Sequence, residues 1–166
     1  MKLIDVSAPL DLTLPNYPGN TPFSLDAIKQ VARGDSPNTS TLHVSAHGGT
    51  HVDAPRHFFD HGAGVDALPL GLLVGRARVI ELVTRRGITA EDLAGLDLSA
   101  NPRVLFKTSN SQRWGSAECH PGYVGVAQSG ARHLVERGVK VVGVDDLSVE
   151  EFKTPGAPAR VVLRRS

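Results

Sequence analysis

Three histidines and one aspartate lie within the twelve residues HGGTHVDAPRHF, which span positions 47–58 of this 166-residue chain. Two imidazoles and a carboxylate, from His47, His51 and Asp53, form a ligand set suited to a divalent first-row metal ion. Three protein ligands leave one position for water, whose pKa a bound metal lowers. His57 lies just beyond and could act as general acid or base. On residue types alone, a metal site and a hydrogen-bonded polar loop both remain open.

An extended chain, and not a helix, is expected to carry these side chains. Gly48 and Gly49 are poor helix formers, and a proline follows closely. A glycine bend after His47 would let the side chains converge and the backbone approach the ion. The alternating residues 40–47 predict a strand before the bend, with one apolar and one polar face. His43 lies on the polar face, either as an additional ligand or as an ordinary strand histidine.

The rest of the chain is rich in expected strands and poor in expected helices. The strands are predicted at residues 2–7, 76–82, 103–108, 139–146 and 160–164. One helix is predicted at 88–96, with Thr89 as N-cap and Asp92 as its capping-box partner, and a longer one at 123–137. Four prolines exclude regular structure between residues 9 and 22. The pattern favours a single domain, residues 1–166, of the α/β or α+β class with a mixed sheet.

Composition narrows the classes of function. The chain is 40% hydrophobic and 21% charged, with a formal net charge of +1 and no long basic run, so nucleic-acid binding has no support. Cys119 is the single cysteine, so no intrachain disulfide can form. Asp5 and Asp11 interrupt the apolar residues near the amino terminus, which argues against a signal peptide or a membrane span. A cytoplasmic protein is expected.

The stretch at 47–58 resembles the signature H-x-G-T-H-x-D-x-P-x-H-F of the cyclase family, which includes bacterial kynurenine formamidases (arylformamidases) and isatin hydrolases. Other segments resemble the family in the same order: IDVSAPL, LPNYPGNTPF, VDALPLGLLVGRARVIEL, VLFKTSN and ARHLVERGVKVVGVDDLSVE. The resemblance implies the family's β/β/α fold. It also implies a metal-dependent hydrolase of a small amide, either an aryl formamide such as N-formylkynurenine or a cyclic amide.

The resemblance implies roles for particular residues. His47, His51 and Asp53 match the family's metal ligands, usually for zinc or manganese, and Asp53 matches a carboxylate that can bridge to a second metal. His57 matches the histidine assigned as proton shuttle. Family members are commonly dimers or tetramers, so a homo-oligomer is expected.

Aromatic residues are expected to contact the substrate. Tyr17 stands in PNYPGN, where the family loop P-x-W-P-G-D carries its aromatic residue, although Asn20 replaces the family's acid. Phe58 could line an apolar pocket or belong to the core. Trp114 could cover the site from a loop or pack on the surface.

The end of the chain departs from the family pattern. The family has a histidine in a stretch like P-x-H-R-x-L-L and a later glutamate, which together complete its metal site. Arg160 stands where that histidine would be, and the glutamate would fall beyond Ser166. The C-terminal part of the family fold is therefore expected to be missing. This departure leaves an alternative function, a catalytically weak relative that acts as a binding or scaffolding protein.

Overall fold

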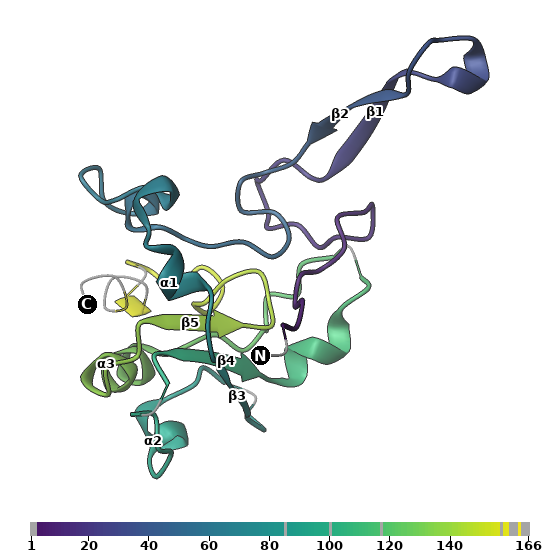
Figure 1. Ribbon diagram of the computed structural model, residues 1–166. Coiled ribbons are helices and arrows are strands. Elements are labelled where there is room, and N and C mark those ends of the chain that lie inside the picture. The colour runs from purple at the N-terminus through teal and green to yellow at the C-terminus, as the bar shows by residue number, and fades with distance from the viewer. Residues whose placement is uncertain are drawn as a thin grey trace. The chain divides into compact units, whose positions relative to one another are not determined.

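The computed structural model describes residues 3–84, 86–99, 101–116, 118–156, 158–159 and 163, which form two compact units. One unit contains the chain up to Val52 together with residues 115–119; the other contains Asp53–Trp114 and the chain from His120 onward. The elements in chain order, with η for 3-10 helices, are β1 (Ser24–Lys29), η1 (Val31–Arg33), β2 (Thr39–His43), η2 (Pro55–His57), η3 (Val65–Ala67), α1 (Leu70–Leu73), β3 (Arg78–Glu81), α2 (Ala90–Leu93), β4 (Arg103–Lys107), η4 (Ser109–Arg113), α3 (Gln128–Glu136) and β5 (Val141–Val144) (Figure 1).

A parallel sheet forms the centre of the second unit. Its strands lie in the order β3-β4-β5, and all pairs are parallel (Figure 1). Val104 and Phe106 of β4 are buried, and Ile80 of β3 is buried beside them, whereas Val79 is 63% exposed. One face of the sheet therefore carries the core. The three strands confirm the strands predicted at 76–82, 103–108 and 139–146, with narrower bounds.

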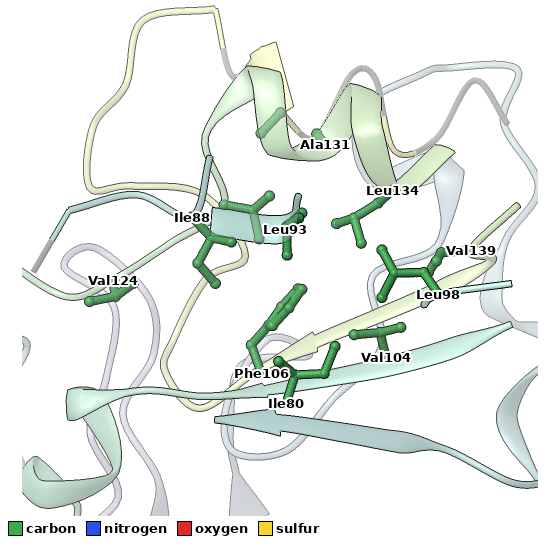
Figure 2. Packing of buried hydrophobic residues seen from close by; sticks show 12 residues of the cluster. Ile80, Ile88, Leu93, Leu98, Val104, Phe106, Val124, Ala131, Leu134 and Val139 are labelled. Atoms are coloured by element: carbon green, nitrogen blue, oxygen red, sulfur yellow. The ribbon is translucent and has the colours of Figure 1, made fainter. Parts of the chain in front are cut away.

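Short helices close the core over that face. Figure 2 shows Leu93 of α2 and Leu134 of α3 directed toward Phe106 on the sheet. Leu93 and Leu134 are fully buried, and burying each such side chain contributes about 1.5–3 kcal/mol. α2 is only four residues long, and its start confirms the predicted cap. Thr89 accepts a hydrogen bond from the backbone N–H of Asp92, whose carboxylate accepts from the backbone N–H of Thr89.

The longer helix starts later than its sequence pattern indicates. The prediction of helix from residue 123 is wrong, because Val126 forms a parallel β-bridge with Ile88 and its N–H donates to the carbonyl of Val149. A turn of helix there would break these bonds. Packing explains the glycine at position 130 within the helix, because a Cβ there would collide with the carbonyl oxygen of Ile88. The helix ends as predicted before Gly138, whose φ is +78°.

The first unit contains an antiparallel hairpin of β1 and β2 (Figure 1). The strand β1 was not predicted, and β2 ends at His43 instead of reaching residue 47. The expected apolar face is not buried: the cross-strand partners Leu25 and Leu42 are 54% and 60% exposed. The ring Nε2 of His43 lies 2.9 Å from a carboxylate oxygen of Asp26 on β1. His43 is thus an ordinary strand histidine in this structure.

The remaining predicted strands differ from the structure or lie outside it. Residues 3–7 form no strand, so that prediction is wrong for them. The carboxylate of Asp5 accepts a hydrogen bond from the N–H of Ser7, and such local bonding competes with a sheet ladder. The predicted strand at 160–164 lies outside the described residues apart from Leu163. None of the helices among the described residues has the length and apolar character needed to cross a bilayer.

Asp145 connects the ends of two parallel strands. It follows β5, and its carboxylate accepts hydrogen bonds from the backbone N–H and hydroxyl groups of both Thr108, after β4, and Ser111, in η4. Burial alone would raise the pKa of Asp145, but these hydrogen bonds outweigh it and hold the pKa below its ordinary value. Burial raises the pKa of the neighbouring Asp146 instead. Asp145 therefore fixes η4 against the sheet as an ionised carboxylate.

Replacing Asp145 by asparagine should destabilise the fold in a pH-dependent way. Because the folded state lowers its pKa, Asp145 stabilises the fold above its ordinary pKa of 3.8 and loses this effect as the pH falls through the folded value. Asp145→Asn should lower the free energy of unfolding by about 2 kcal/mol at neutral pH, the scale of hydrogen bonds to a charged group. This difference in the free energy of unfolding should shrink as the pH is lowered. Urea unfolding of the wild type and of Asp145→Asn, from neutral to acid pH, measures the difference.

Asp146→Asn is the matched control. Since burial favours the protonated form of Asp146, removing its charge should not destabilise the protein at neutral pH. A deficit for Asp145→Asn that stays constant between neutral and acid pH would show that the charge of Asp145 contributes nothing.

Candidate metal centre

A tight turn precedes the histidine-rich segment. The N–H of Gly48 donates to the carbonyl of Ser45 at 2.8 Å, and Gly49 has a φ of +66°, in the left-handed region that glycine adopts without strain. The chain then continues without regular structure from His51 to Ala54. The expected glycine bend after His47 is confirmed, and no helix forms here. The turn also explains why β2 ends early.

The bend brings the side chains of His47, His51 and Asp53 together. One potential ligand atom from each lies within 4.8 Å of the other two, and all three residues are half-buried. The imidazole rings of His47 and His51 meet edge to face, with centroids 5.1 Å apart and an angle of 83° between the ring planes. Ligand atoms on opposite sides of an ion with bonds of about 2.0–2.2 Å are roughly 4 Å apart, so this spread is close to that of a coordination sphere.

A backbone hydrogen bond selects the tautomer of one neutral imidazole. The Nδ1 of His51 lies 2.8 Å from the carbonyl oxygen of Gly49. A carbonyl can only accept, so Nδ1 carries the hydrogen and donates it. The neutral ring then presents the lone pair of Nε2, as metal-binding histidines do when a carbonyl holds their other nitrogen. The local geometry therefore fits a divalent cation.

His57 is placed differently from these three residues. It ends the 3-10 helix η2, which begins with Pro55, and its side chain is exposed to solvent. Its ring packs edge to face against Phe58, with centroids 4.2 Å apart. Among the described residues, the group able to hold an ion consists of His47, His51 and Asp53 and does not include His57. This placement suits a group that exchanges protons with solvent better than a ligand.

The three aromatic candidates lie on separate segments. Tyr17 is half-buried in a turn, where the N–H of Asn20 donates to the carbonyl of Tyr17 and Gly19 has a φ of +96°. Phe58 is half-buried beside His57. Trp114 follows η4, is 42% exposed and donates from its indole nitrogen to the carbonyl of Asp145. Their contact with substrate stays a prediction.

Sequence reasoning missed the residues that support the turn. The carbonyl of Gly49 accepts a hydrogen bond from Nδ1 of His51. The hydroxyl of Thr50 accepts a hydrogen bond from the N–H of Ala8. The glycine pair signalled a bend, but it could not indicate which carbonyl would bind His51. The contact with Ala8 spans 42 positions and has no local signal. Arg160, expected at the place of a family histidine, lies outside the described residues.

Comparison with known proteins places the chain in a family. A family model described as "Putative cyclase" matches residues 4–151. A structure titled as a potential metal-dependent hydrolase with cyclase activity is 32% identical, with a TM-score of 0.81, and the alignment covers 98% of this chain and 76% of that one. A predicted metal-dependent hydrolase from Bacillus stearothermophilus is also 32% identical, with a TM-score of 0.80 and coverage of 99% and 78%.

A third solved structure agrees in fold. An isatin hydrolase bound to the product analogue thioisatinate is 20% identical, with a TM-score of 0.78, and the alignment covers 98% of this chain and 75% of that one. Parallel and antiparallel strand pairs with few helices confirm the expected α/β class. The family match covers most of the chain, including the segment that carries His47, His51 and Asp53. The chain therefore belongs to the cyclase family, and it shares its fold with solved structures titled as a potential and a predicted metal-dependent hydrolase.

Proposed function

We propose that this protein is a metal-dependent hydrolase that cleaves the carbon–nitrogen bond of a small amide. The observation that carries the proposal is the convergence of two imidazoles and a carboxylate from His47, His51 and Asp53. The two solved relatives at 32% identity, one titled as a potential and the other as a predicted metal-dependent hydrolase, support it. The alternative is a binding protein that keeps the metal without turnover.

The three converging residues would hold one divalent cation, which we propose to be zinc or manganese. Imidazole nitrogens suit zinc, carboxylate oxygens suit zinc and the harder manganese ion, and the single carboxylate adds a negative charge to the site. When bound, such an ion lowers the pKa of a coordinated water and polarises a carbonyl oxygen. The hydrogen bond from His51 to Gly49 keeps one imidazole lone pair aimed away from the turn, so little reorganisation is needed on binding.

We propose that His57 moves the proton that hydrolysis requires. Adding water across an amide forms a carbon–oxygen bond, breaks the carbon–nitrogen bond and transfers a proton to the leaving nitrogen. Histidine is suited to this transfer because its ordinary pKa lies near neutral pH. His57 is exposed and follows Asp53 by four positions, on a short helix whose start Pro55 defines. It can therefore exchange its proton with solvent between turnovers.

The proposed substrates are an aryl formamide, such as N-formylkynurenine, or a cyclic amide. In an aryl formamide, and in an aryl-fused cyclic amide such as isatin, the amide nitrogen is bonded to an aromatic ring, and aromatic side chains bind such rings favourably. Tyr17, Phe58 and Trp114 are the proposed contacts. Because Trp114 already donates its indole N–H to Asp145, it would offer the face of its ring and no hydrogen bond. A homo-oligomer in the cytoplasm is part of the same proposal.

Measurements of metal binding should distinguish the proposed ligands from the proposed proton carrier, His57. The purified protein should bind about one zinc or manganese ion per chain, as expected for three convergent donors. His51→Ala should abolish binding at micromolar metal, because it deletes one of three ligands, whereas His57→Ala should leave binding unchanged. Elemental analysis of protein prepared without a metal-affinity tag and isothermal titration calorimetry measure this.

His43→Ala is the matched control for loss of an imidazole, since His43 is bonded to Asp26 on the hairpin and should not affect the metal. Loss of the metal in His57→Ala as complete as in His51→Ala would contradict the assigned roles. A wild-type protein that stays free of metal after incubation with zinc or manganese would overturn the proposed site.

Hydrolysis should depend on both the metal and His57. With metal in excess, the protein should turn over N-formylkynurenine or isatin at a rate within the usual enzymatic range of roughly 1–10³ per second. A chelator should abolish the activity, and His57→Ala should reduce kcat by about 10²-fold without loss of metal. The rate is measured from the change in absorbance of the aromatic substrate as N-formylkynurenine loses formate or as the isatin ring opens. Full metal occupancy without turnover of either substrate would favour the binding protein.

A further inference from the structure

A turn near the amino terminus brings two leucines to one side of the chain. The carboxylate of Asp11 accepts hydrogen bonds from the N–H of Thr13 at 2.8 Å and from its hydroxyl at 2.6 Å. The N–H of Leu14 donates to the carbonyl of Asp11 at 3.1 Å. Such a side-chain-supported turn reverses the chain within a few residues. Leu10 and Leu14 flank the turn and can therefore contact the same neighbour.

That neighbour is the glycine that holds His51. A Cβ on Gly49 would lie 2.9 Å from a methyl carbon of Leu10 and 3.5 Å from a methyl carbon of Leu14. Both leucines therefore pack directly on the backbone of Gly49. Leu14 is only 9% exposed, whereas Leu10 is 53% exposed, so Leu14 forms the buried part of this contact. The carbonyl of this same Gly49 accepts the hydrogen bond from Nδ1 of His51.

A second contact fixes the next residue along. The backbone N–H of Ala8 donates to the hydroxyl oxygen of Thr50 at 2.8 Å. Gly49 and Thr50 lie between His47 and His51 in the sequence. Residues 8–14, which we name the N-terminal clamp, thus hold the link between two proposed metal ligands through one hydrogen bond and two apolar contacts.

We propose that the N-terminal clamp positions His51 for metal binding, with Thr50, Leu10 and Leu14 as positioning residues. The inference rests on the proposed metal site. A link containing two adjacent glycines has many accessible conformations unless something holds it. The clamp removes that freedom before the ion arrives, and preorganisation of this kind raises affinity. Linkage is reciprocal, so a bound ion must also stabilise the clamp by the same factor.

The test compares Thr50→Val with Thr50→Ser. Valine keeps the shape and β-branching of threonine but cannot accept the hydrogen bond from Ala8, whereas serine can. Thr50→Val should bind zinc about tenfold more weakly than the wild type, the lower end of the effect of removing groups that support metal ligands, and Thr50→Ser should bind within about twofold of the wild type. Competition with a chromophoric chelator gives the affinities.

Hydrogen exchange provides a readout that does not depend on activity. Zinc should slow exchange of the backbone amide of Ala8 in the wild type and in Thr50→Ser, and by less in Thr50→Val. A second pair of variants tests the apolar contacts. Leu10→Ala should weaken zinc binding, whereas Leu12→Ala should not, because Leu12 is 77% exposed and is not among the nearest neighbours of Gly49.

The outcomes distinguish this inference from the proposed function. If the wild type binds zinc and Thr50→Val and Leu10→Ala bind it equally well, the clamp does not position the site, and the proposed function stands. If zinc leaves exchange at Ala8 unchanged although it binds tightly, the linkage is absent and the inference fails. If the wild type binds no zinc or manganese, the proposed function and the inference fail together.

Discussion

The hydrogen bond from His51 to the carbonyl of Gly49 is the interaction on which the proposed chemistry depends. It fixes which nitrogen of the ring carries the proton and which direction the other nitrogen faces. The bond exists because Gly49 adopts a positive φ, which turns its carbonyl back toward the side chain two residues later. A residue with a side chain would be strained in this conformation and would also collide with Leu10. The glycine at position 49 therefore serves geometry as much as flexibility.

The parallel sheet provides stability of a different kind. Its core gathers Leu93, Leu134 and Phe106 into one buried hydrophobic cluster (Figure 2). Asp145 then bonds the segments that follow two adjacent strands, at the end of a parallel sheet where loops commonly carry function. Its carboxylate receives backbone and hydroxyl hydrogen bonds, so its ionised form is stabilised despite partial burial. In this chain, the carboxylate of Asp145 at this end of the sheet has a structural role.

The errors of the sequence-based predictions have common physical causes. Apolar periodicity indicated a helix from residue 123, but Val126 is buried by a β-bridge to Ile88, and burial by either route produces the same pattern. Residues 3–7 are apolar enough for a strand, yet Asp5 bonds the backbone locally. The hairpin strand β1 was missed, and its apolar side chains remain exposed in the described structure. Periodicity reports burial and local preference, whereas strand pairing depends on a distant partner.

The sequence by itself determined the chemistry that this protein can carry, its family resemblance and the local elements whose signals lie within a few residues. The glycine bend, the capping box of Thr89 and the ligand types at His47, His51 and Asp53 are of this kind, because the interacting groups are near neighbours in the chain. Only the tertiary structure decided that His43 pairs with Asp26, that Asp145 binds η4, and that residues 8–14 contact Gly49 and Thr50. These contacts join residues far apart in sequence, and such pairing depends on how the whole chain packs.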